Sequence, residues 1–153
     1  RAYQTTTTIE LSNNFTEYPM ILFKNPLGSG KTVYIRNITF ANTTGASKAI
    51  TLKVYSNPTV TNSGSALTPN SMFIGGSAPI TITNITYTGA IAPGTLTVSA
   101  SGINLSTFVS TNETTNIDYN WGLLISANNS ILISGIPAAN NQKTTVNIIW
   151  SEV

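Results

Sequence analysis

The sequence predicts an all-β protein: an antiparallel β-sandwich, jelly-roll-like, with an extended strand at its N-terminus. Charged residues make up only 8% of the 153 residues, about a third of the usual share, which argues against a helical bundle. Polarity comes instead from 25 Thr, 18 Asn and 16 Ser. Apolar residues do not recur at helical spacing, whereas segments rich in Thr, Ile, Val and aromatic residues recur every 10–15 residues.

We expect ten short strands, separated by turn clusters of Gly, Pro, Asn and Ser. They span Thr5–Leu11, Met20–Lys24, Thr32–Ala41, Ala49–Tyr55, Ile80–Thr88, Thr95–Ser99, Asn104–Val109, Tyr119–Ser126, Ser130–Ser134 and Thr144–Trp150. Apolar and polar residues alternate along Ala49–Tyr55 and Thr144–Trp150, as in strands with one buried face. The alternation slips at Ile35–Ile38 and at Asn84–Ile85, which indicates a bulge or a change of face. The longest connection, Asn57–Asn70, is predicted to be an ordered surface loop.

Residues 1–13 form an N-terminal arm that differs from the predicted sandwich of residues 14–153. Its run of Thr resists helix because β-branched side chains are stiff at χ1, and it ends at the break Asn13–Asn14. Two interpretations are open: an ordinary first strand of its own sheet, or a strand donated to a neighbouring subunit. The face that would be donated carries Tyr3, Thr5, Thr7, Ile9 and Leu11.

The residue types present exclude much of enzyme chemistry. Cys and His are absent, so the chain cannot build a disulfide, a Zn–Cys site, a thiolate nucleophile or a Ser–His triad. The segment Gly28–Thr32 (GSGKT) is similar to the tail of a phosphate-binding loop, but Asn25 stands where the first Gly is needed and a strand follows instead of a helix. We therefore reject nucleotide binding, and we expect neither a cofactor nor a metal.

The carboxylates also give no sign of a catalytic pair. They are Glu10, Glu17, Glu113, Asp118 and Glu152. Glu113 and Asp118 are the only close pair, but they flank a predicted loop, and we expect them to be solvated surface charges. The same acids could promote a Lys–Asn crosslink, although the sequence pairs no donor with an acceptor. We expect a protein that is not an enzyme.

Charge and hydropathy limit the partners. The net charge of +2 is too small and too scattered for a nucleic-acid surface. The longest apolar runs, Met20–Phe23 and Trp121–Ile125, fall far short of the roughly 18 residues of a membrane span. The sequence starts at Arg1 without a visible signal peptide, and we expect a mature secreted chain.

Seven Asn-X-Ser/Thr sequons are present, against roughly four or five expected by chance from this composition. In a chain secreted by a glycosylating cell, several would carry N-linked glycans. The candidates are Asn14, Asn37, Asn42, Asn84, Asn104, Asn112 and Asn128. Trp121 and Trp150 could form a sugar-stacking platform, but we expect both to pack in the core.

The composition favours self-association. Low charge weakens repulsion between identical subunits, and a head-to-tail contact that does not close produces a filament. A donated strand that fills a groove in the next subunit satisfies the backbone groups of both partners.

Two resemblances agree with this expectation. The arm RAYQTTTTIELSNN, the seven sequons and the Thr/Asn/Ser-rich body resemble thread-type surface filament subunits of archaea. That resemblance implies a glycosylated homopolymer on the cell surface, in which each β-rich head accepts its neighbour's N-terminal strand. The segments ILFKNPLGSGKTVYI and VYSNPTVTNSGSALTPNSM are similar to phrases in phage virion surface proteins that decorate capsids or form fibres.

We therefore expect a structural subunit of an extracellular cell-surface filament that polymerises by donating its N-terminal strand. One alternative is a viral decoration or fibre protein on the virion surface, assembled as a closed trimer. Another is a carbohydrate-binding module, which would need Trp121 or Trp150 exposed.

Overall fold

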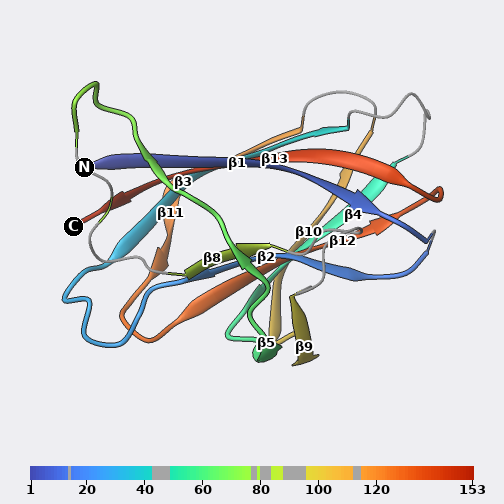
Figure 1. Cartoon of the computed structure of the whole chain (residues 1–153), viewed down its shortest axis with the longest axis horizontal. Coiled ribbons are helices and arrows are strands. Elements are labelled where there is room, and N and C mark those ends of the chain that lie inside the picture. Colours follow the sequence, from blue (N-terminus) through green and yellow to red (C-terminus); the bar gives the residue numbers. More distant parts are fainter. Residues whose placement is uncertain (14, 43–48, 77–78, 80–83, 88–95, 112–114) are drawn as a thin grey trace.

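The chain folds as two packed antiparallel β-sheets. The structure, a computed structural model, describes residues 1–13, 15–42, 49–76, 79, 84–87, 96–111 and 115–153, and it does not describe the side chains at 84–87, 116 and 119–121. Every regular element in these residues is a strand (Figure 1). The predicted all-β sandwich is confirmed.

The first sheet has the strand order β11-β3-β13-β1-β7. Its members are β11 (Thr115–Ile125), β3 (Val33–Asn42), β13 (Gln142–Glu152), β1 (Ala2–Leu11) and β7 (Asn70–Ser71). The first and last long strands of the chain are therefore neighbours, and they run side by side across the molecule (Figure 1).

The second sheet has the order β10-β4-β12-β2-β8-β6. Its members are β10 (Ile103–Ser110), β4 (Ile50–Ser56), β12 (Ser130–Pro137), β2 (Tyr18–Lys24), β8 (Asn84–Tyr87) and β6 (Ser65–Ala66). A separate pair is formed by β5 (Thr59–Asn62) and β9 (Thr97–Ala100). Each of the ten expected strands overlaps one of these elements, although much of Ile80–Thr88 lies outside the described residues.

Alternating side chains build the core between the two sheets. Ile50, Leu52 and Val54 of β4 are fully buried, as the alternation along Ala49–Tyr55 predicts. The same holds for the alternating apolar residues of β13. Both sets belong to one continuous cluster that joins the sheets, and apolar burial of this kind is the main favourable term in folding.

A bulge explains the slip of alternation in β3. Ile35 pairs with Trp150 and Asn37 pairs with Ile149, so Arg36 is an extra residue. Ile35 and Ile38 can therefore both point into the core. At the second predicted slip, β8 pairs with β2 in unbroken register from Asn84 to Tyr87, so no bulge occurs between these paired residues.

A third layer covers part of the outer face of the second sheet. Leu22, Tyr55 and Leu132 point outward from β2, β4 and β12 and pack with Leu96. Val60 of β5 and Val98 of β9 pack against this second cluster. The expected loop Asn57–Asn70 is in fact partly strand, because β5 and β6 lie within it and β7 begins at its last residue. Sequence alternation did not reveal these strands because two of the three contain only two residues.

The connection between β2 and β3 agrees with the sequence. The GSGKT segment lies between β2, which ends at Lys24, and β3, which begins at Val33, so it is a turn between strands. Among the described residues there is no helix that could span a membrane.

Candidate functional site: the N-terminal strand and its groove

The N-terminal strand β1 lies near the edge of the first sheet. It pairs with β13 along its whole length, from Ala2 opposite Ser151 to Leu11 opposite Gln142. In the part of the chain that the structure describes, its other edge pairs only with the two-residue strand β7, at Tyr3 and Gln4. Most of the backbone pairing of β1 is therefore with a single partner strand.

The inward face of β1 is the face predicted from the sequence. Tyr3, Thr5, Ile9 and Leu11 are buried and Thr7 is half-buried. We call the apolar surface that borders this face the strand groove; it consists of Val146, Ile148 and Trp150 on the neighbouring β13 and of Met20 and Phe23 on β2 of the opposite sheet, all fully buried.

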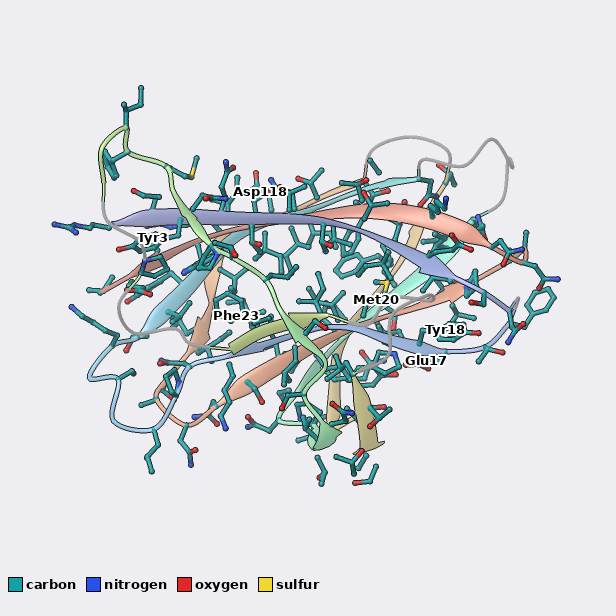
Figure 2. The ribbon with its side chains drawn as sticks, viewed as in Figure 1. Tyr3, Glu17, Tyr18, Met20, Phe23 and Asp118 are labelled. Atoms are coloured by element: carbon teal, nitrogen blue, oxygen red, sulfur yellow. The ribbon has the colours of Figure 1, made fainter. Side chains whose placement is uncertain are left out.

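Aromatic rings fill one end of the strand groove. The rings of Tyr3 and Trp150 have centroids 5.9 Å apart, and Phe23 meets Trp150 edge-on with centroids 5.1 Å apart. Figure 2 shows Tyr3 and Phe23 on the two sheets, facing the interior between them. Aromatic pairs of this geometry add stability beyond the area that they bury.

A glycine makes room at the other end. A Cβ atom on Gly135 of β12 would lie 3.2 Å from the Leu11 side chain and 2.9 Å from the sulfur of Met20. The missing side chain leaves room over β12 for Leu11 of β1 and for Met20 of the neighbouring β2. The strand groove therefore extends the length of β1.

The outward face of β1 carries a row of polar pairs with β13. Thr6 Oγ1 donates a hydrogen bond to Asn147 Oδ1 at 2.9 Å. The hydroxyls of Thr8 and Thr145 are 2.8 Å apart. These cross-strand contacts are neutral, and each such pair contributes modestly to the sheet.

Among the residues described, the charged pair of this row lies at its end. Glu10 Oε2 lies 3.4 Å from Lys143 Nζ. The Lys143 side chain is about half exposed, so the pair contributes little to stability.

The turn after β1 is closed by backbone hydrogen bonds. Phe15 N donates to Pro137 O at 2.8 Å, and Asn141 N donates to Ser12 O at 3.0 Å. This turn carries the chain from the first sheet to β2 in the second sheet. The segment between Leu11 and Tyr18 is therefore the hinge that any exchange of β1 would open.

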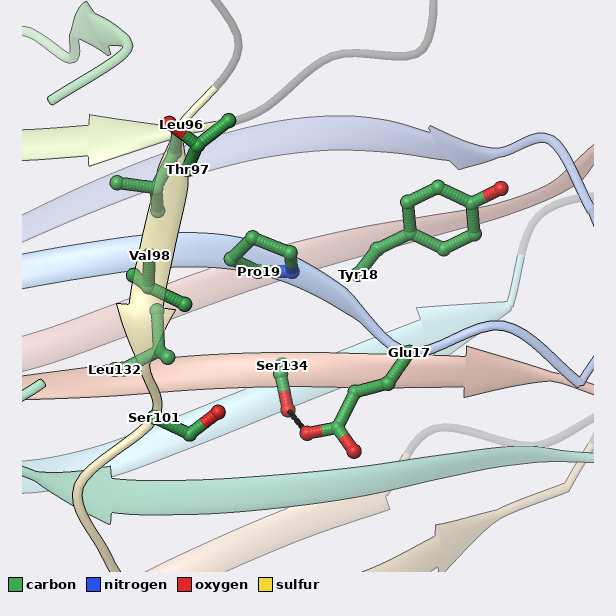
Figure 3. Close-up of a pocket in the computed structure, with 9 residues that line it drawn as sticks. All are labelled: Glu17, Tyr18, Pro19, Leu96, Thr97, Val98, Ser101, Leu132 and Ser134. Atoms are coloured by element: carbon green, nitrogen blue, oxygen red, sulfur yellow. Dashed lines mark hydrogen bonds between the residues drawn. The ribbon is translucent and has the colours of Figure 1, made fainter. Parts of the chain in front are cut away.

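A polar cluster lies where the hinge enters β2. The Glu17 carboxylate accepts hydrogen bonds from Lys53 Nζ at 2.9 Å, Tyr55 Oη at 2.7 Å and Ser134 Oγ at 2.6 Å. It borders a hollow of about 480 Å³ that β9 flanks, and Figure 3 shows the Ser134 bond at its wall. Sequence reasoning missed this cluster, since its donors come from β4 and β12.

The cluster shifts the ionisation of its members. Burial raises the pKa of Glu17, but the bonds from Ser134, Lys53 and Tyr55 together outweigh it, so the net pKa lies below its usual value. The bond to Glu17 raises the pKa of Lys53. Burial, helped by the bond to Glu17, raises the pKa of Tyr55. Each shift favours the protonation state that makes these hydrogen bonds: an ionised Glu17, a charged Lys53 and a protonated Tyr55.

We expect Glu17 to set an acid limit on stability. Because its pKa is lower in the folded chain, its contribution is present above the usual value of 4.5 and is lost as the pH falls through the folded value. Urea unfolding measured from pH 7 to pH 2 should show this loss. Glu17→Gln should flatten the acid slope, and Ser134→Ala should reduce it, because the loss of this hydrogen bond brings the folded pKa of Glu17 closer to its usual value. An unchanged slope in Glu17→Gln would contradict this role.

The described sequons differ in exposure. Asn104 and Asn128 are exposed, in β10 and in the turn before β12. Asn37 is half-buried in β3 and accepts a hydrogen bond from Thr39 at 2.7 Å. Asn42 Nδ2 donates to the carbonyl oxygens of Ser110 and Thr111, which occupies the nitrogen that a glycan would need. Residues 14 and 112 and the side chain at position 84 lie outside the described structure.

The other sequence candidates can also be placed. Trp150 is fully buried, which confirms its expected place in the core and removes it as a sugar-stacking surface. The side chain of Trp121 and all of Glu113 lie outside the described residues, and Asp118 is exposed. Among the described carboxylates, Glu17 accepts hydrogen bonds from three side chains, and the sequence did not single it out.

No protein-family model matches the chain, and a search of curated proteins found no match.

Proposed function

We propose that the chain is a structural subunit of an extracellular cell-surface filament. Each subunit donates β1 to the strand groove of the next, so that the polymer grows head-to-tail. N-linked glycans would be carried at exposed sequons, of which Asn104 and Asn128 are the best placed among the described residues. The subunit is structural and performs no catalysis.

The observation that carries this proposal is the placement of β1. It is the first strand of the chain, it lies beside β13 near the edge of its sheet, and its loss would break no pairing between other strands. Besides its pairing with β13 and the packing of its inward side chains in the core, it makes two pairs with β7 and accepts or donates hydrogen bonds at Met72 N–Ala2 O and Thr5 Oγ1–Thr68 O. A strand with these properties can leave its own groove and enter an identical one with every contact regained.

The side chains of β1 favour a long-lived contact between a donated strand and the strand groove of the next subunit. The inward face combines Tyr3, Ile9 and Leu11, all buried. Burying one such side chain stabilises by roughly 1.5–3 kcal/mol. The outward face adds neutral hydrogen bonds to Thr145 and Asn147. An exchanged strand would bury the same surface between subunits as it buries within one chain.

We expect disulfide trapping to reveal the exchange. The chain contains no Cys, so Thr8→Cys with Thr145→Cys creates a single possible crosslink between side chains that meet across β1 and β13. If β1 is donated, oxidation of the assembled protein should join different subunits and give a ladder of multimers on a non-reducing gel. Reduction should return the monomer.

A matched control lies elsewhere in the chain. Thr61 and Thr97 also have hydroxyls 2.8 Å apart, but they join β5 to β9, which no exchange of β1 separates. Cysteines at these positions should crosslink only within one subunit. If the Thr8–Thr145 crosslink also forms only within single chains, β1 is an ordinary strand of its own sheet and the proposal is wrong. A ladder that stops at a trimer would favour the closed virion oligomer.

A further inference from the structure

Phe15 has an unusual backbone conformation in the hinge. Its φ is +56°, in the left-handed region. The other described non-glycine residues with positive φ are Asn57, Asn128 and Asn141. Asn enters this region readily because its short polar side chain bonds locally, whereas a bulky residue there is strained.

Packing does not compensate for this conformation. The Phe15 side chain is 77% exposed, so its ring gains little from the fold. The conformation is instead imposed by the turn, in which Phe15 N donates to Pro137 O and Asn13 N donates to the hydroxyl of Tyr18. These contacts reverse the chain after β1, so that it continues into β2.

We infer that Phe15 is a strained hinge residue that biases the subunit toward strand exchange. This inference rests on the proposed function. When β1 fills its own groove, the hinge must double back, and Phe15 must adopt the left-handed conformation. When β1 fills a neighbour's groove, the hinge spans two subunits and Phe15 can return to an extended conformation. Strain is thus confined to the closed monomer, as in hinge loops that promote domain swapping.

Three substitutions separate backbone strain from loss of the aromatic ring. Phe15→Gly and Phe15→Asn both remove the ring and tolerate positive φ. Phe15→Ala removes the ring but keeps the strain. The fraction of subunits in polymers at equilibrium, measured by sedimentation against protein concentration, gives the balance between closed and exchanged forms.

We expect Phe15→Gly and Phe15→Asn to shift this balance toward the closed monomer by on the order of tenfold. Phe15→Ala should remain close to the native chain. If all three variants assemble alike, the hinge inference is wrong, while crosslinks between subunits through Thr8 and Thr145 would still uphold strand donation. If the native chain forms no such crosslinks, the proposed function fails, and with it any role of Phe15 in exchange.

Discussion

A chain that lacks residues 1–13 should neither fold stably nor assemble. Without β1, the strand groove loses its cover, and Phe23, Val146 and Trp150 become accessible to water. The deleted side chains Tyr3 and Ile9 are at most 3% exposed, and with Leu11 they account for roughly 5–9 kcal/mol of burial. That loss is comparable with the whole stability of an ordinary domain, about 5–15 kcal/mol. Circular dichroism and sedimentation should show an unfolded or aggregated chain.

A free peptide should rescue this truncated chain. The peptide of residues 1–13 carries the whole of β1 and should bind the open groove, which would restore the sandwich as a closed monomer without polymerisation. A control peptide with Ile9→Asp and Leu11→Asp should fail, because both side chains point into the core. A control with Thr6→Ser and Thr8→Ser should still bind, since these positions are exposed. If the truncated chain is as stable as the full one, β1 is not needed to cover the strand groove and this prediction is wrong.

Trp150→Ala should destabilise the chain by about 3–5 kcal/mol. Trp150 is fully buried and contacts Tyr3 on β1 and Phe23 on β2, so its removal leaves a cavity that two sheets share. Trp150→Phe should cost much less. The buried indole N–H meets no acceptor among the described residues, so the smaller ring also removes an unpaired polar group.

Urea unfolding measures these differences directly. Leu124→Ala is a suitable control, because Leu124 is apolar but 54% exposed and its truncation should change stability by less than about 0.5 kcal/mol. A loss for Trp150→Ala no larger than that control would mean that Trp150 does not hold the two sheets together. Assembly of Trp150→Ala should weaken in parallel, since the same ring lines the strand groove.

Local patterns in the sequence were enough to predict the sandwich. Alternation with period two marks the core face of β4, β13 and β1, because each of these strands has one face inward. The slip at Ile35–Ile38 predicted the bulge at Arg36 correctly. Such features depend on neighbours along one strand, so the sequence displays them directly.

The candidate site was predicted only in part. The inward face of β1 followed from alternation, but its partner β13 lies at the far end of the chain, and no local signal indicates that pairing. The Glu17 cluster was missed for the same reason: Lys53, Tyr55 and Ser134 reach it from distant strands. The left-handed conformation of Phe15 was also invisible, because nothing in the letters around it demands positive φ.

The antiparallel pairing of β1 with β13 has a mechanical consequence. Arg1 lies beside Glu152, so in a closed monomer a pull on the two chain ends would peel the strands apart one pair at a time. In an exchanged polymer, the load would enter β1 through its Leu11 end, while β13 of the neighbour would be held along its other edge by its pairing with β3. Tension along the strand would then shear ten residue pairs at once. The same hydrogen bonds that unzip easily in the monomer would form a joint of high tensile strength in the filament.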